Sequence, residues 1–374
     1  MSSDSIHEQR MRRLPAAWGL DAVVAMSPEN FPFVSSANIT TLSHLRPRHA
    51  YAVLLANADP MLVVCTIERR TAVGESWIKH VVTYQEFIEI PVEALAAQLR
   101  ASGVASGSIG IDLEYLPATS FEQLKAALPK ARFVNTTEMI AAVRSVKTPT
   151  EIEQLSAAAK GTHRATLAAM SSAKPGDSER DIARRIVDGM MANGANGTLF
   201  LVFGAGKRTA TTHAVASGYV PQPGDIVRFD VGGHFGSFFS DFARTYSAGD
   251  PTPMQRDVYR ALARIQAETI GEIQVGMTGE DVFYSCRDAC ARAGLDFSMP
   301  HIGHSFGYEL HEAPMLRPGE KLTLKEGMTF NVEPFVFDEI GAGYHLEDLI
   351  LVGSKGASVL TLGLAPPEIP SMGV

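Results

Sequence analysis

The sequence predicts an α+β protein of two domains: a smaller N-terminal α/β domain over residues 1–146 and a larger domain over residues 147–374. A chain of 374 residues is long for one domain. Its first part alternates short apolar segments with amphipathic helical segments, which is typical of an α/β domain. Its second part has four long helical segments among strand-like segments, which indicates helices packed on a curved antiparallel sheet.

Composition and charge describe an ordinary globular protein and exclude several classes of partner. Hydrophobic residues make up 45% and charged residues 20% of the chain. The formal net charge of −8 argues against nucleic acid as the main partner. No apolar run approaches the ~20 residues that span a bilayer, and the first fifteen residues are too polar for a signal peptide, so we expect no membrane association. Three widely spread cysteines provide no disulfide framework, which favours a reducing, cytoplasmic setting.

The N-terminal domain is predicted from its alternation of strands and helices. Short apolar runs predict strands at residues 22–26, 51–55, 61–65 and 108–112. Helical spacing of apolar residues predicts helices at residues 91–100 and 120–128. No glycine-rich phosphate loop follows these strands, so nucleotide binding is not expected here.

The domain boundary is predicted near Val146, because a helix start follows at once. Thr148 and Glu151 form the ends of a capping box, with Pro149 at the first helical position. Further helices are predicted at residues 178–193, after Thr252-Pro253, and from Thr278 to Gly294. The proline-containing tail, residues 363–374, is not expected to be regular.

Residues 225–244 predict a hairpin that carries two aspartates. A two-residue turn at Phe235-Gly236 would pair Asp241 with Asp230, with Cβ atoms roughly 4.5–5.5 Å apart. The double glycine at 232–233 could add a bulge and shift this register. Two carboxylates placed side by side among phenylalanines repel each other and lose hydration, which a bound divalent cation would offset. The alternative is two exposed polar strand residues.

A second hairpin and a histidine segment extend this pattern. A three-residue loop at residues 339–341, with glycine in the left-handed position, would pair Glu333 with Glu347. In the segment 300–314, glycines flank His304, which suggests close backbone approach around a fixed imidazole. Four carboxylates and one imidazole suit two divalent cations bridged by shared carboxylates. Hard oxygen ligands favour manganese, and cobalt, iron or zinc could also bind.

These segments resemble the pita-bread metallopeptidase family, which includes methionine aminopeptidase, aminopeptidase P, prolidase and creatinase. The residues that carry the resemblance lie in segments 225–244, 300–314, 327–334 and 343–352. The first 146 residues resemble the N-terminal domain of the aminopeptidase P, prolidase and creatinase branch, so the likeness covers nearly the whole chain. It implies a pita-bread catalytic domain, a homodimer, and hydrolysis of the amide bond between an N-terminal residue and proline.

The resemblance also implies roles for individual residues. The metal ligands would be Asp230, Asp241, His304, Glu333 and Glu347, with Asp241 and Glu347 shared between the two ions. His213 and His311 match the histidines on the substrate side, where they would donate hydrogen bonds to the carbonyl oxygen that becomes negative. Glu333 would move the proton from the attacking water to the leaving nitrogen.

Two residues depart from the family pattern and keep other substrates open. Ser305 replaces a glycine that usually follows the ligand histidine. His345 replaces an arginine that in prolidase-like members helps to hold the substrate's carboxylate. The resemblance therefore implies that His345 contacts the substrate, although a histidine cannot make the same two-pronged contact. We therefore retain the alternatives of a creatinase-like C–N hydrolase or lyase acting on a small non-peptide substrate, and of a binding module without activity.

Overall fold

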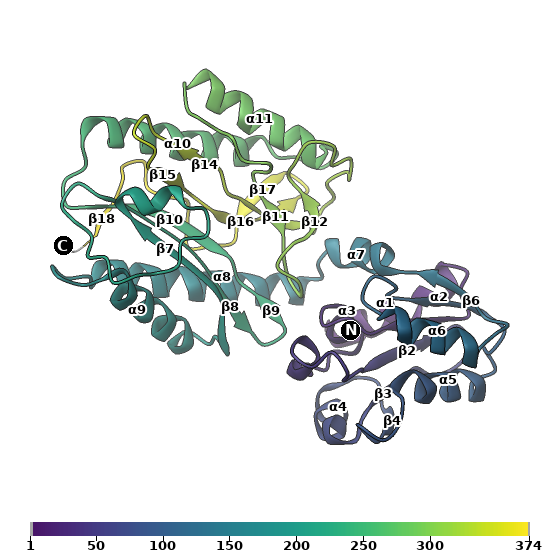
Figure 1. Cartoon of the computed structure of the whole chain (residues 1–374). Helices are drawn as coiled ribbons and strands as arrows, with labels where there is room; N and C mark the ends of the chain where they lie inside the picture. The colour runs from purple at the N-terminus through teal and green to yellow at the C-terminus, as the bar shows by residue number, and fades with distance from the viewer. Residues whose placement is uncertain (1–2, 373–374) are drawn as a thin grey trace. The chain divides into compact units, whose positions relative to one another are not determined.

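The computed structural model describes residues 3–372 (Figure 1). They divide into two compact units, one that ends at Arg144 and one that begins at Ser145. Each unit combines helices with sheets, which confirms the predicted α+β class. Among residues 3–372 no helix is both long and apolar enough to cross a membrane.

The N-terminal unit contains one mixed six-stranded sheet, with the strand order β4-β3-β2-β1-β5-β6. Its strands are β1 (Ala22–Ala25), β2 (Tyr51–Leu55), β3 (Met61–Cys65), β4 (His80–Tyr84), β5 (Ser108–Ile111) and β6 (Arg132–Asn135). The four strands expected from the sequence are present. The two edge strands β4 and β6 were not predicted, because an edge strand is only half-buried and has less apolar sequence.

Helices cover this sheet. They are α1 (Ser3–Arg12), α2 (Leu14–Ala17), α3 (Asn30–Ser35), α4 (Arg69–Glu75), α5 (Pro91–Ala101), α6 (Ala118–Ala127) and α7 (Thr137–Ser145), with short 3₁₀ turns at Thr40–Ser43 and Thr66–Glu68. Leu95 and Leu99 of α5 and Leu124 of α6 are fully buried in one apolar core with Val24 and Val53 of the sheet. The helices expected at 91–100 and 120–128 are thus confirmed.

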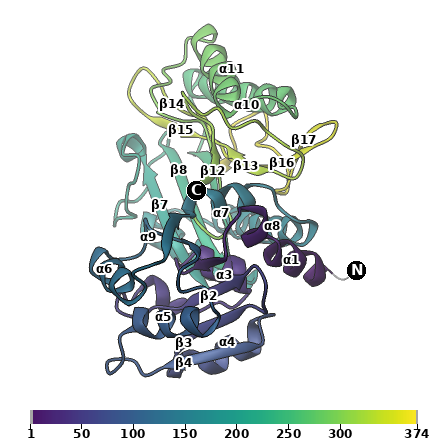
Figure 2. The same ribbon diagram turned by 90° about the vertical axis from the view of Figure 1, so that its right-hand side faces the viewer.

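The C-terminal unit has two layers of sheet, each covered by a pair of helices (Figures 1 and 2). The first layer contains β7 (Gly197–Ala205), β8 (Ile226–Phe235), β9 (Phe238–Phe239), β10 (Phe242–Ala248) and β18 (Ser371–Met372), covered by α8 (Pro149–Ser171) and α9 (Glu179–Ala192). The tail therefore contributes a two-residue strand where none was expected, paired in parallel with the end of β10.

The second layer contains β13 (Thr329–Val332), β16 (Asp348–Gly353) and β17 (Gly356–Val359), beside the hairpin of β14 (Phe335–Phe337) and β15 (Gly343–His345). The helices α10 (Pro253–Glu272) and α11 (Gly279–Arg292) cover it. A separate short pair consists of β11 (His304–Ser305) and β12 (Glu312–Met315). A 3₁₀ turn, Gly206–Ala210, follows β7.

All four long helices of this unit begin at a capping box, in which two side chains satisfy backbone N–H groups that the helix cannot. The boxes are Thr148 with Glu151, Ser178 with Asp181, Thr252 with Gln255, and Thr278 with Asp281. The starts predicted from these sequences are confirmed.

The two predicted hairpins differ in outcome. In the second, Val332 pairs with Asp348 and Phe335 with His345, so Glu333 lies opposite Glu347 as predicted. In the first, the predicted register is wrong by two residues, because Asp230 pairs with Ala243. The turn lies one residue further along, at Gly236-Ser237, because glycine takes a positive φ of 64° at the first turn position. A shift of two keeps both aspartates on the same face.

Candidate active site

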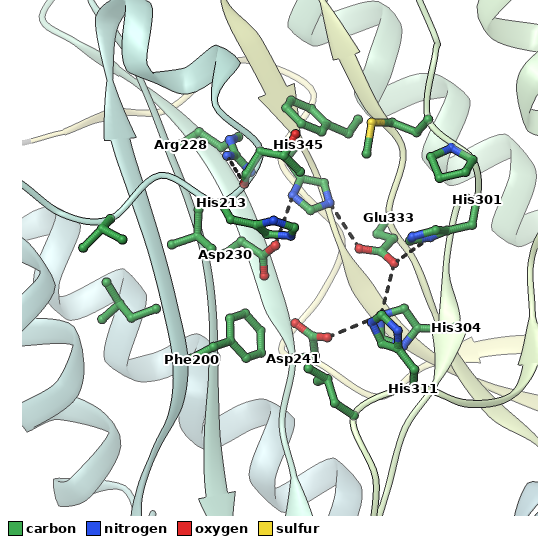
Figure 3. A pocket seen from close by; sticks show the side chains of 18 residues that line it. Phe200, His213, Arg228, Asp230, Asp241, His301, His304, His311, Glu333 and His345 are labelled. Carbon is green, nitrogen blue, oxygen red and sulfur yellow. Dashed lines mark hydrogen bonds and ion pairs between the residues drawn. The ribbon is translucent and has the colours of Figure 1, made fainter.

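Four carboxylates from the two layers of the C-terminal unit meet at one place, and Figure 3 shows three of them, Asp230, Asp241 and Glu333. Asp230 lies on β8, Asp241 just before β10, Glu333 just after β13 and Glu347 just before β16. Asp230, Asp241 and Glu347 offer ligand atoms that all lie within 4.8 Å of one another. Glu333, His345 and Glu347 form a second such group, so Glu347 belongs to both.

Three of these carboxylates are held in an environment that disfavours negative charge. Burial raises the pKa of Asp241 and of Glu347 well above the usual range, and the neighbouring carboxylates raise both further. Burial also raises the pKa of Asp230, although His345 opposes this effect. Such a cluster is stable in its ionised form only when positive charge is placed among the carboxylates.

Glu333 differs from the other three because imidazoles surround it. Its Oε1 lies 3.3 Å from Nε2 of His304 and 3.5 Å from Nδ1 of His301, and its Oε2 lies 3.4 Å from Nε2 of His345. Burial alone would raise the pKa of Glu333. The field of His304 and the contacts with the other two rings outweigh burial, so this pKa lies well below its usual range.

The ring of His304 is oriented by the carbonyl group of the next residue. Its Nδ1 lies 3.1 Å from the carbonyl oxygen of Ser305, a contact in which the ring nitrogen donates. The lone pair is then on Nε2, which points at Glu333 and lies 3.6 Å from Oδ2 of Asp241. The expected close approach beside this histidine is also present, because a Cβ on Gly303 would lie 1.9 Å from the carbonyl oxygen of Asn331.

Further contacts fix Glu347. Nδ2 of Asn331 donates a short hydrogen bond to its Oε1. Its backbone N–H donates to the carbonyl oxygen of Ala243 at 3.1 Å, and its own carbonyl oxygen accepts from Nη1 of Arg244. The guanidinium of Arg244 also pairs with Asp348 at 2.7 Å. These bonds connect the first hairpin to the second at the point where the carboxylates meet.

Unpartnered polar atoms show that the cluster fits metal ions. Oδ1 of Asp230, Oε2 of Glu347 and both ring nitrogens of His345 are buried and make no hydrogen bond within residues 3–372. Buried polar atoms in proteins are rarely left in that state. Oxygen-rich ligands with one or two imidazoles are the donors that Mn²⁺, Fe²⁺, Co²⁺ or Zn²⁺ bind, so the residues present fit divalent cations.

A cavity of about 580 Å³ opens in front of the cluster. His213 and His311, the two predicted substrate-side histidines, both line it, as does His345. The ring of His311 lies with its centroid 4.1 Å from that of His304, and burial lowers the pKa of His311 to about 4. The structure thus brings every site residue named from the sequence to one cavity, apart from Glu347, which lies behind it in the metal cluster.

The sequence reasoning missed two residues of the cavity wall and one possible ligand role. His301 contacts Glu333 and lies in the segment of His304, so its spacing of three residues was a usable signal. Arg228 lies two residues before Asp230 on β8, and strand alternation places both on one face. His345, expected only to contact substrate, also belongs to a ligand group with Glu333 and Glu347.

The fold and this cluster define a metal-dependent hydrolase, and the sequence comparisons agree. Residues 153–354 match the family model of metallopeptidase family M24, and residues 9–146 match that of the creatinase/prolidase N-terminal domain. The chain belongs to metallopeptidase family M24. The predicted resemblance to the creatinase, aminopeptidase P and prolidase branch is confirmed.

Relatives and solved structures cover nearly the full chain. A Xaa-Pro dipeptidase of Pyrococcus furiosus is 28% identical over 326 residues, which are 87% of this chain and 90% of that protein. The crystal structure of dipeptidase PepE from Mycobacterium ulcerans has a TM-score of 0.84 at 26% identity, with 100% of this chain and 99% of that chain covered. The prolidase from Pyrococcus furiosus has a TM-score of 0.81 at 26% identity, with 95% and 100% covered.

Proposed function

We propose that the protein cleaves the amide bond between an N-terminal residue and proline, with two divalent metal ions in the carboxylate cluster. The observation that carries the proposal is the pair of ligand groups that share Glu347. Two groups with a common carboxylate are what a two-metal hydrolase requires. Relatives along most of the chain are named Xaa-Pro dipeptidases, which supports this substrate class.

The ligands in this proposal are the four carboxylates of the two groups, Asp230, Asp241, Glu333 and Glu347, together with His304. His304 is included because its Nε2 lies 3.3 Å from Glu333 and 3.6 Å from Asp241. The ions would supply an activated water and polarise the carbonyl group that it attacks. Because four of the five ligands are carboxylates, we propose manganese as the preferred ion, with cobalt, iron or zinc as alternatives.

The protein's own groups would move the protons and stabilise charge. Glu333 remains ionised because of the imidazoles beside it, so its Oε atoms can accept a proton from the attacking water and pass it to the leaving nitrogen. His213 and His311 line the cavity and would donate hydrogen bonds to the carbonyl oxygen as it becomes negative. His345, whose Nε2 lies 3.4 Å from Oε2 of Glu333, would also contact the substrate.

A second function is kept because of one local observation. Ser305, which departs from the usual glycine, is fully buried and accepts a hydrogen bond from Nζ of Lys147 at 2.7 Å. It is therefore built into the support of His304. A creatinase-like C–N hydrolase or lyase acting on a small non-peptide substrate remains the alternative for this site.

We also propose the organisation and setting of the protein. The boundary near residue 146 would separate a creatinase-type N-terminal domain from the catalytic domain of residues 147–374. A homodimer follows from the family resemblance. Cys65, Cys286 and Cys290 are free and buried thiols, which supports a reducing, cytoplasmic setting.

The deciding experiment measures release of the N-terminal residue from Xaa-Pro dipeptides and from longer Xaa-Pro-Yaa peptides, with added manganese and with chelator. The proposal expects release that manganese supports and chelator abolishes. If metal-loaded protein cleaves none of these peptides, Xaa-Pro cleavage is wrong and small amide or C–N substrates are to be tested. Full activity after exhaustive chelation would rule out the metal-dependent mechanism.

A further inference from the structure

The wall of the cavity contains a buried arginine that forms no direct ion pair with a carboxylate of residues 3–372. Arg228 lies on β8, two residues before Asp230, and its side chain is 0% exposed. Burial lowers the pKa of Arg228, and the charge of Asp230 opposes this effect without an ion pair between the two side chains. Arg244, which is also buried, pairs directly with Asp348 at 2.7 Å, and the partly buried Arg48 pairs with Glu86 at 2.7 Å.

The guanidinium of Arg228 is held firmly but is only partly used. Its Nη2 donates to the carbonyl oxygens of Thr211 at 2.9 Å and Thr212 at 2.7 Å. Its Cζ lies 4.6 Å from the centroid of the Phe335 ring, at a distance typical of a cation–π contact. Its Nε is buried without a hydrogen-bond partner among the described residues. Donors therefore remain free on a group whose position is fixed.

A buried charge without a direct ion pair is costly, and the nearby Asp230 is itself a proposed metal ligand, so the presence of Arg228 needs a reason. Backbone carbonyl groups offset part of the cost but carry no net charge. A ligand with an anionic group would offset the rest, and a carboxylate is the group that a planar guanidinium binds best. Since Arg228 lines the cavity, such a ligand can be the substrate.

The position of Arg228 fits one end of a short peptide. Thr211 and Thr212, to which it is bonded, immediately precede His213, and Asp230 is its neighbour on the same strand face. In a dipeptide only the nitrogen and Cα of the second residue separate the scissile carbonyl carbon from the terminal carboxylate. The groups that bind the scissile carbonyl and the terminal carboxylate must therefore lie close together. His213 and Arg228 meet this condition, because both line the cavity and Arg228 is bonded to the residue just before His213.

We propose that Arg228 is a specificity-determining residue that binds the terminal carboxylate of the substrate, so that the protein prefers dipeptides with a free C-terminus. This inference rests on the proposed Xaa-Pro cleavage. It adds to that function the anionic group that the substrate must carry and the residue that recognises it.

The test compares Leu-Pro with its C-terminal amide on manganese-loaded protein. The unmodified protein should cleave the free acid with a kcat/KM at least about 30-fold above that of the amide, because a buried charge-assisted contact is lost with the amide. Arg228→Met should remove this preference, mainly by raising KM for the acid, so that kcat/KM falls about 30-fold more for the acid than for the amide. Arg228→Lys should restore part of the preference, because the charge is kept but the planar fork is not.

Arg208→Met is the matched control. Arg208 precedes the same turn, but its guanidinium is paired with Glu179 at 3.0 Å rather than placed in the cavity wall. The preference for acid over amide should survive this change. Equal cleavage of acid and amide by the unmodified protein would overturn the inference, without any need for a folded variant. Equal loss on both substrates in Arg228→Met would also overturn it, because it would show only that the His213 turn needs support.

A binding measurement separates failure of this inference from failure of the proposed function. Calorimetric titration with L-proline and with prolinamide requires no turnover. The inference expects the unmodified protein to bind proline more tightly than prolinamide, and Arg228→Met to bind both alike. If Leu-Pro is not cleaved but this difference is found, the proposed cleavage fails and the anion site stands. If the unmodified protein binds both equally, the anion site fails.

Discussion

The two carboxylate hairpins of the C-terminal unit reach one cluster by different routes. In the second hairpin Glu333 and Glu347 lie opposite each other within a continuous register. In the first, Asp230 lies opposite Ala243, and Asp241 lies in the irregular stretch between β9 and β10. Each hairpin keeps one register on both sides of its carboxylates, so the second places its two carboxylates directly opposite each other, whereas the first offsets them by two residues.

The hairpins also differ in how their surroundings shift the pKa values of their carboxylates. The pKa of both aspartates on the first hairpin is raised by burial and mutual repulsion. On the second, the pKa of Glu347 is raised, but that of Glu333 is lowered by the imidazoles around it. This difference supports the proposed division of labour, in which the first hairpin would provide ligands and the second would also provide a proton acceptor.

The largest expected effect concerns this proton acceptor. Glu333→Gln should lower kcat on an Xaa-Pro dipeptide by about 10²–10⁴-fold, because the amide cannot accept the proton. Steady-state kinetics with manganese, together with the metal content of the variant, provide the measurement. Glu339→Gln, at the exposed tip of the same hairpin, is the control and should change kcat by less than about twofold. A variant with full activity at position 333 would show that the two hairpins do not differ in role.

Metal removal is expected to have the next largest effect. At a free ion concentration of 100 times Kd, binding should add about 2.7 kcal/mol to the free energy of unfolding, because only the folded protein assembles the ligands. Thermal unfolding with manganese and with chelator measures this gain. Asp241→Asn should reduce the gain and also stabilise the metal-free protein, since a repelling charge is removed. Equal stability with and without metal would contradict the assigned ligands.

The same two hairpins show how far sequence reasoning reaches. The register of the second follows from local chemistry, because a three-residue loop ending in glycine needs the positive φ of 83° found at Gly341. The first hairpin contains glycine at 232, 233 and 236, and each could have marked a bulge or a turn. Tertiary contacts select among them: Gly236 donates its N–H to Oδ1 of Asn196 at 2.7 Å, which the local sequence does not encode.

The sequence predicts that the four carboxylates and His304 gather at one site, but it does not predict the residues that surround them. Aspartate, glutamate and histidine at strand positions with fixed spacing carry their own chemical signal. Arg228 has no such signal, because an arginine in a strand usually reaches solvent. Its burial depends on Phe335 and on the Thr211–Thr212 carbonyl groups, and these come from other segments. The role of His345 likewise depends on its distance to Glu333, which only the packing of the strands fixes.

Glycine substitutions would show whether the turn or the close approach of the strands at Gly232 makes the first hairpin different. A Cβ on Gly232 would lie 2.4 Å from the carbonyl oxygen of Ser240, whereas one on Gly236 or Gly341 would meet nothing within 4 Å. Gly232→Ala should therefore lower the free energy of unfolding by about 1–3 kcal/mol through overpacking. Gly236→Ala and Gly341→Ala should each lose about 1 kcal/mol from the positive φ alone. Urea unfolding measures all three, and equal losses would place the difference in the turns.

The last prediction concerns the support behind the first hairpin, and its effect appears only at acid pH. His163 of α8 packs on Phe242 at the start of β10, with ring centroids 4.2 Å apart, and its Nδ1 accepts from the N–H of Leu362 at 3.3 Å. Burial, with the nearby charges of Arg244 and Arg164, lowers the pKa of His163 to about 3 from an ordinary value of 6.5. Between these values the unfolded chain binds a proton that the folded protein does not, so stability present above pH 6.5 is lost as the pH falls toward 3.

His163→Gln keeps an acceptor but cannot titrate, so its unfolding free energy should fall less steeply between pH 6 and 4, by about 1.4 kcal/mol per pH unit. Parallel curves for the two proteins in chemical denaturation would show that this imidazole is protonated in the folded state, and that the first hairpin is not supported by a neutral ring.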